Sequence, residues 1–372
     1  MREALKMTAV VLIIVFGIAA AFVWADDHYE AVYSDTTSHD IMSVHLDPEG
    51  NMLDMPVAVE QTAPTSDLPT LTRTKTGFAV AWDEEDVQPH VRAHALDPSG
   101  RPVGAAHVIA YGRSTEMRPV LSPSPLGIAI TWMDRAPNTN TTDDTVGDSA
   151  TYVGLLADDL SLRNDVPPQR VDPSAHAGYP WLAGDGGNLG LLWSDNQTGV
   201  IDPYFGPVGA QLAVGKSTDV RGATVENAAQ LGRMTLTDVG YLAAWEDLRS
   251  GSEEIYMSLL DPSGNRYAGG LVEEPGTGSA NWPHMAWTGS SAAIVYYQYR
   301  AGKPQIFLTF IDQNGARING AADAQVSNTS EQARFPDVQW TGSEFGVMWI
   351  DTRNGEPELY FNRALCMKPA PI

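Results

Sequence analysis

Four residues beside prolines have side chains that could bind an acidic or sugar ligand. Arg118, Tyr179 and Trp282 each directly precede a proline, and Arg334 stands two residues before Pro336. Arginine binds carboxylate and sulfate groups through paired hydrogen bonds, and aromatic faces add stacking and cation–π contacts. These four residues are therefore the candidate ligand-binding site. Packing between neighbouring structural units is the alternative explanation of the two aromatic residues.

Carboxylates suggest a second kind of chemistry. Asp67, Asp134, Asp195 and Asp351 could supply the two carboxylates that glycoside hydrolases place on either side of the scissile bond. No sequence motif here is tied to a mechanism, so the sequence favours binding over catalysis and names no catalytic residue. A glycoside hydrolase or lyase acting on polysaccharide remains the alternative.

One acidic stretch could bind calcium. Asp143, Asp144 and Asp148 offer the oxygen ligands that Ca²⁺ prefers, although their spacing is not that of an EF-hand. A polar loop without metal is the alternative, and Ca²⁺ is the only cofactor that the sequence suggests. The histidines are scattered, no His-Glu-x-x-His occurs, and Cys366 is the only cysteine. This spacing predicts no zinc site.

These residues belong to a repeat that sets the architecture. An aromatic residue ends an apolar run about every 50 residues, the spacing of repeat units in propellers. The aromatic residues are Tyr33, Trp82, Trp132, Trp193, Trp245, Tyr296 and Trp349.

Each repeat is punctuated in the same way. A proline stands upstream of most of the aromatic residues, an aspartate stands two residues downstream of most, and turns such as Asp97-Pro98-Ser99-Gly100 follow. Aspartate, proline and glycine at these places are typical of a type I turn. Short runs rich in β-branched and aromatic residues lie between these marks, which indicates four strands a unit.

The repeat therefore predicts an all-β chain, a β-propeller of seven blades. Residues 29–58 offer three strands at the start and residues 336–365 offer three at the end, so we expect incomplete end blades. Six blades, with an N-terminal strand that closes the ring, is the alternative.

A second repeated element follows the aromatic residue. It reads Trp-x-Asp-x-Arg-x-Gly in Trp245–Gly251 and in Trp349–Gly355. A ring of such carboxylates and guanidinium groups could bind a ligand. We instead expect Asp247 to pair with Arg249, and Asp351 with Arg353, as structural partners within their turns, because every blade needs this turn.

The first residues predict the compartment. Residues 1–25 combine Arg2 and Lys6, an apolar run and a small residue at Ala25, the order of a signal peptide. An uncleaved membrane anchor is the alternative, and residues 26–372 form the single propeller domain. We expect an exported protein, periplasmic or extracellular, that contacts a membrane only through that segment. A net charge of −23 argues against nucleic acid as a partner and leaves a glycan or a protein.

The repeats resemble those of exported bacterial β-propeller proteins, in which Trp-x-Asp-x-Arg-x-Gly is followed after three residues by Ile or Leu and then Tyr. The uniform blades, the acidic composition and the absence of a motif tied to a mechanism favour a binding or scaffold propeller. Arg334-Phe335-Pro336 is more distantly similar to the Phe/Tyr-Arg-Ile-Pro pattern of sialidases, whose arginine binds the substrate carboxylate. Here Ala333 replaces the aromatic residue, and the Ser-x-Asp-x-Gly-x-Thr-Trp boxes of sialidases are absent. This second resemblance implies a sialidase-like hydrolase as the alternative function.

Overall fold

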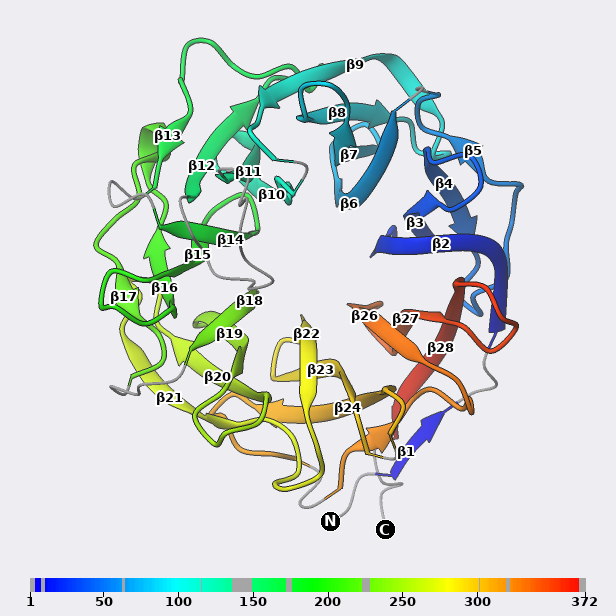
Figure 1. Cartoon of the computed structure of the whole chain (residues 1–372), viewed down its shortest axis with the longest axis vertical. Coiled ribbons are helices and arrows are strands. Elements are labelled where there is room, and N and C mark those ends of the chain that lie inside the picture. The colour runs from blue at the N-terminus through cyan, green and yellow to red at the C-terminus, as the bar shows by residue number, and fades with distance from the viewer. Residues whose placement is uncertain are drawn as a thin grey trace.

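Short antiparallel strands joined by tight turns make up most of the described chain. The computed structural model describes residues 4–7, 11–61, 64–114, 116–135, 149–171, 176–222, 228–300, 302–318 and 322–367. The strands form seven four-stranded blades around a central channel, which confirms the predicted seven-bladed propeller (Figure 1). In six of the blades the strands pair in chain order, from the innermost to the outermost.

Five blades are separate sheets of consecutive strands. The second contains β6 (Thr65–Arg73), β7 (Phe78–Glu85), β8 (His90–Leu96) and β9 (Pro102–Tyr111). The third contains β10 (Val120–Ser124), β11 (Gly127–Arg135), β12 (Ser149–Leu156) and β13 (Gln169–Arg170). The fourth contains β14 (Ala177–Gly184), β15 (Leu189–Asp195), β16 (Asp202–Pro207) and β17 (Thr218–Asp219), with the short 3-10 helix η1 (Ala210–Leu212). The fifth contains β18 (Ala229–Thr237), β19 (Gly240–Asp247), β20 (Glu254–Leu260) and β21 (Arg266–Leu271). The sixth contains β22 (Ala280–Trp287), β23 (Ser291–Gln298), β24 (Gln305–Asp312) and β25 (Ala324–Gln325).

The first and seventh blades share one strand. The seventh holds β26 (Ala333–Trp340), β27 (Phe345–Asp351) and β28 (Glu358–Met367), and β1 (Ala4–Met7) also pairs with β28. The first holds β3 (Tyr29–Asp35), β4 (Ile41–Leu46) and β5 (Val57–Ala58). The long strand β2 (Val11–Trp24) pairs with β28 through its first part and with β3 through its second part.

The end blades are therefore complete, and the expectation of incomplete ones was wrong. The N-terminal segment supplies the missing outer strand of the seventh blade and the missing inner strand of the first (Figure 1). The six-bladed alternative was also wrong, although the N-terminal strand that it invoked does close the ring. Within the part of the chain that the structure describes, no helix is long and apolar enough to cross a bilayer.

The core consists of separate apolar layers between neighbouring blades. Each of the seven repeated aromatic residues is at most 5% exposed and lies in a cluster that combines its own blade with the preceding one. Trp245 of β19, for example, packs with Leu192 of β15 and Phe205 of β16. The predicted burial of these residues is confirmed, because each aromatic residue fills the space between two twisted sheets.

The Trp-x-Asp-x-Arg element forms a structural corner. Asp247 Oδ2 accepts hydrogen bonds from Trp245 Nε1 at 2.9 Å and from the Arg249 guanidinium at 2.6 Å. The Arg249 guanidinium also lies 3.9 Å from the ring centre of Tyr256 on the next strand. Asp351 and Arg353 repeat the pair at 2.5 Å. The predicted pairing of Asp247 with Arg249 and of Asp351 with Arg353 is confirmed.

Candidate functional site: the channel cavity

The innermost strands reach the channel through an unusual backbone conformation. From the second blade to the seventh, the residue before the proline position has a φ between 47° and 58°. Residues other than glycine rarely adopt this left-handed backbone conformation, so its recurrence at one repeat position indicates that the fold requires it there. In five of these blades a bulge in the strand pairing, such as that between Asp67 and Thr70, accompanies it. The chain thereby bends at the mouth of the channel.

Side chains on both sides of this bend line a cavity of about 440 Å³ in the channel. That volume lies within the usual range for small-ligand sites. The lining includes Leu68, Arg118, Tyr179, Trp282 and Phe335 before the proline position, and Thr70, Val120, Trp181, Arg233, His284 and Asp337 after it.

Two guanidinium groups share one indole in this cavity. The Arg118 guanidinium lies 5.9 Å from the ring centre of Trp282 and 5.0 Å from that of Tyr179. The Arg233 guanidinium lies 4.8 Å from Trp282 and 4.5 Å from Trp181. Blades that are not neighbours thus bring two positive charges together among aromatic faces, which is an arrangement suited to an anion.

The surroundings of Arg233 leave its charge poorly compensated. Its side chain donates to His284 Nε2 at 3.3 Å and to Gly232 O at 3.2 Å, and neither acceptor is a carboxylate. The other ring nitrogen of His284, Nδ1, lies 3.0 Å from Asp337 Oδ1. Burial, followed by the charge of Arg118, lowers the pKa of Arg233. A bound anion would offset both effects.

Buried carboxylates accept hydrogen bonds from the backbone of two channel residues. Glu246 Oε1 accepts the backbone N–H of Trp282 at 2.8 Å, and Asp83 Oδ2 accepts that of Arg118 at 3.0 Å. Burial raises the pKa of Glu246 to about 7, and it also raises the pKa of Asp83 well above its ordinary value. Both carboxylates stand directly after the repeated aromatic residue of the preceding blade, so in these two places one blade supports the channel residue of the next.

The structure brings together three of the four residues predicted to bind a ligand. Arg118, Tyr179 and Trp282 line the cavity. Arg334 is not among the lining residues, and its guanidinium donates to Tyr299 Oη at 2.8 Å. The residue at the equivalent position in that blade is Phe335, whose ring contacts Trp282 with a centroid separation of 5.1 Å.

The four candidate catalytic aspartates do not converge on the cavity. Asp67 lines it, whereas Asp134 forms an ion pair with Arg113 at 3.0 Å. Asp195 and Asp351 are buried in the corners of their blades, where each accepts a tryptophan N–H. Asp143, Asp144 and Asp148 lie outside the described residues, so the calcium prediction stays a prediction.

Sequence reasoning missed the residues that follow the proline position. Trp181, Arg233, His284 and Asp337 all stand there, and they differ from blade to blade as strongly as the residues before it. The sequence analysis compared the residues directly before the proline position of each blade. The same comparison of the residues directly after that position would have found these four. The partnership of Arg118 with Arg233 has no signal in the sequence, because the two arginines lie in blades that are not adjacent in the ring.

Comparisons with known proteins support the fold. No protein-family model matches the chain, and no curated protein matches it in sequence. Among solved structures, a puromycin-hydrolysing peptidase of Mycobacterium tuberculosis matches with a TM-score of 0.56 and 15% identity, over 90% of this chain and 50% of the peptidase. The phage phi92 endosialidase matches with a TM-score of 0.55 and 10% identity, over 100% of this chain and 70% of the endosialidase. A Trypanosoma rangeli sialidase matches with a TM-score of 0.51 and 10% identity, over 96% and 59%.

These similarities establish a class and no more. The chain spans half the length of the peptidase and less than two thirds of the Trypanosoma sialidase. Identities of 10–15% show a shared fold alone. The chain is a seven-bladed β-propeller with sialidase-like structural neighbours, and its ligand must be argued from its own cavity.

Proposed function

We propose that this protein is an exported binding propeller that holds a small acidic ligand, a glycan bearing a carboxylate or sulfate group, in its central channel. The observation that carries the proposal is that the guanidinium groups of Arg118 and Arg233 both lie within about 6 Å of the ring centre of Trp282, at 5.9 Å and 4.8 Å. One acidic group between them would accept charge-assisted hydrogen bonds from both. The rest of a sugar would lie against Tyr179 and Trp181.

Charge adds a second argument. The chain carries a net charge of −23, so its overall field repels anions. Arg118 and Arg233 gather two positive charges in a cavity that Asp67 and Asp337 also line, and Arg118 Nε is buried without a hydrogen-bond partner among the described residues. A structure that only needed to fill its channel would not require this concentration of positive charge.

We favour binding over hydrolysis. Three of the four carboxylates that the sequence offered for catalysis are engaged in blade corners or in the pair with Arg113. The endosialidase and sialidase among the structural neighbours share only the fold with this chain, so the class of ligand rests on the two guanidinium groups. Export is proposed from the N-terminal residues, in line with the sequence analysis.

The test begins with a glycan array that carries neutral, uronate, sialyl and sulfated glycans. The best ligand is then titrated calorimetrically into the wild type and into Arg118→Ala. A hydrogen bond to a charged group contributes about 1.5–3 kcal/mol, so Arg118→Ala should weaken binding roughly tenfold to a hundredfold. Arg334→Ala is the matched control, because it removes an arginine that lies outside the cavity lining. Equal affinities of the wild type and Arg118→Ala would place the ligand elsewhere and overturn the proposal.

A further inference from the structure

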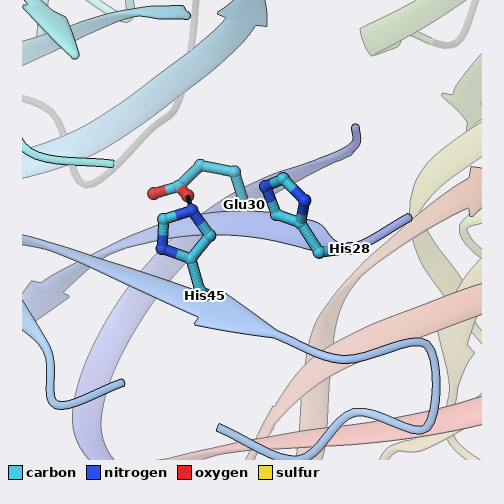
Figure 2. A group of neighbouring side chains, drawn as sticks. All are labelled: His28, Glu30 and His45. Atoms are coloured by element: carbon cyan, nitrogen blue, oxygen red, sulfur yellow. Dashed lines mark ion pairs between the residues drawn. The ribbon is translucent and has the colours of Figure 1, made fainter. Parts of the chain in front are cut away.

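Two histidines and a glutamate meet in the first blade, away from the cavity lining. His28 lies in the connection between β2 and β3, Glu30 in β3 and His45 in β4, and Figure 2 shows the three side chains turned toward one another. One ligand atom from each residue lies within 4.8 Å of the other two. His45 is distant in the sequence from His28 and Glu30, and the pairing of β3 with β4, which sets Glu30 opposite His45, brings it to them.

Glu30 is a fully buried carboxylate without an arginine or lysine contact among the described residues. Its Oε1 accepts a hydrogen bond from Ser43 Oγ. Its Oε2 lies 3.0 Å from His45 Nε2, and that nitrogen also lies 3.4 Å from Pro98 O. Burying a carboxylate is costly unless a cation or donors compensate it. The free side of Glu30 therefore calls for a positive charge between the carboxylate and the histidines.

His28 is oriented in the way that metal-binding histidines are. Its Nδ1 lies 2.8 Å from Asp27 Oδ1, while its Nε2 is buried and has no hydrogen-bond partner among the described residues. Histidine ligands commonly donate their second ring N–H to a carboxylate, which fixes the ring and leaves the other nitrogen for the metal. The His28 side chain is 18% exposed, so water can reach this side of the cluster.

We propose that His28, Glu30 and His45 form a binding site for a divalent transition metal ion, Zn²⁺ in the first instance. Two histidines and a glutamate, with water as the fourth ligand, are an established donor set for zinc. Tetrahedral bond lengths place neighbouring ligand atoms about 3.3 Å apart, close to the separation of Glu30 Oε2 and His45 Nε2. The ligand atom of His28 lies within 4.8 Å of the other two and would have to move closer to complete the set.

The site would fasten the closure of the ring. His28 follows the strand β2 that joins the first and seventh blades, and Ser43 Oγ contacts Gly100 O of the second blade at 3.0 Å. A Cβ at Gly100 would lie 2.6 Å from Glu30 Oε1, so the turn approaches the carboxylate as closely as glycine allows. A metal ion here would tie the ring-closing hairpin to β4 beside this turn.

The experiment uses full-length protein without an affinity tag, dialysed against EDTA and titrated calorimetrically with Zn²⁺. We expect one Zn²⁺ per chain, and Co²⁺ in its place should give the visible absorption of a tetrahedral site. Asp27 would not bind the metal itself but would hold the ligand His28. Loss of such a supporting carboxylate lowers metal affinity about 10–100-fold, so Asp27→Asn should weaken Zn²⁺ binding by that factor and His28→Ala by more than about 100-fold. His107→Ala is the matched control, because His107 is a partly exposed histidine outside the cluster.

His28 is partly exposed, so His28→Ala should fold. Comparing the circular dichroism spectra of the variant and the wild type separates loss of folding from loss of Zn²⁺ binding. Glu30→Gln keeps the shape of the side chain, and it should also abolish Zn²⁺ binding. If the wild type and His28→Ala bind Zn²⁺ equally, or neither binds it, then His45 and Glu30 form only a buried ion pair and the proposal is wrong.

Discussion

Glu246 supports the channel from a buried position that an ionised carboxylate does not favour. Its Oε1 holds the backbone of Trp282, and its neighbour Asn281 is also buried. Burial raises the pKa of Glu246 to about 7, while the hydrogen bond from Trp282 and the charge of Arg233 act in the opposite direction. The folded protein therefore retains a proton on Glu246 at pH values where the unfolded chain has lost it.

The sign of the resulting pH dependence follows from linkage. An acid whose pKa is raised by folding contributes fully below its unfolded value, and that contribution is lost as the pH rises through about 7. Glu246→Gln should remove this loss, so the variant should gain up to about 3 kcal/mol over the wild type above pH 7 and little at pH 4. Urea unfolding at pH 5 and pH 8 measures the difference, with exposed Glu356→Gln as the control. Parallel pH profiles for the wild type and Glu246→Gln would contradict this account.

Within a blade, the repeated Trp-x-Asp-x-Arg corner keeps the same contacts, but the charged residues around its aspartate differ from blade to blade. Asp247 is fully buried and also accepts hydrogen bonds from Arg221, which is itself buried and paired with Asp202 at 2.7 Å. Burial alone would raise the pKa of Asp247, but hydrogen bonds from Arg249 and Arg221 outweigh it and lower the pKa to about 2. Asp351 has the Arg353 contact in the corresponding corner of the seventh blade.

These networks predict unequal effects of the same substitution. Asp247→Asn leaves the buried Arg221 with one carboxylate fewer, so it should destabilise the fold by about 3 kcal/mol. Asp351→Asn breaks a pair whose arginine is partly exposed, so it should cost about 1 kcal/mol. Calorimetric unfolding at pH 7 compares the two variants, and neither should change binding in the channel. Equal losses would show that Arg221 contributes nothing to the corner.

At the scale of the whole molecule, ring closure depends on a segment that the sequence also marks as a signal peptide. Strand β2 covers the edges of both β28 and β3, and its Phe22 is buried against Tyr29 and Phe361. Unpaired strand edges and exposed apolar residues would remain in the first and seventh blades without it. Removal at Ala25 and closure through β2 are therefore competing uses of the same residues.

Two measurements distinguish these uses. A chain that begins at Asp26 should unfold at a lower temperature than the full-length chain, because it loses the pairing of β2 on both sides. Differential scanning calorimetry makes the comparison, and coincident transitions would show that the ring closes without β2. The intact mass of the protein recovered from an exporting host then reports which form the cell keeps.

The repeat by itself determined the propeller, the number of blades and the burial of the seven aromatic residues, because each blade is specified by local turn chemistry and alternating apolar positions. It also singled out Arg118, Tyr179 and Trp282, which line the cavity, since unlike residues at one repeat position stand out against uniform neighbours. Their role in ligand binding stays a prediction. The tertiary structure alone decided that Arg233 joins them and that Arg334 does not. Contacts across the channel depend on how the ring closes, and spacing along the chain carries no information about that distance. The sequence suggested an N-terminal strand that closes the ring, but not that β2 pairs with both β28 and β3. The meeting of His28, Glu30 and His45 was hidden because it depends on the register in which β3 pairs with β4.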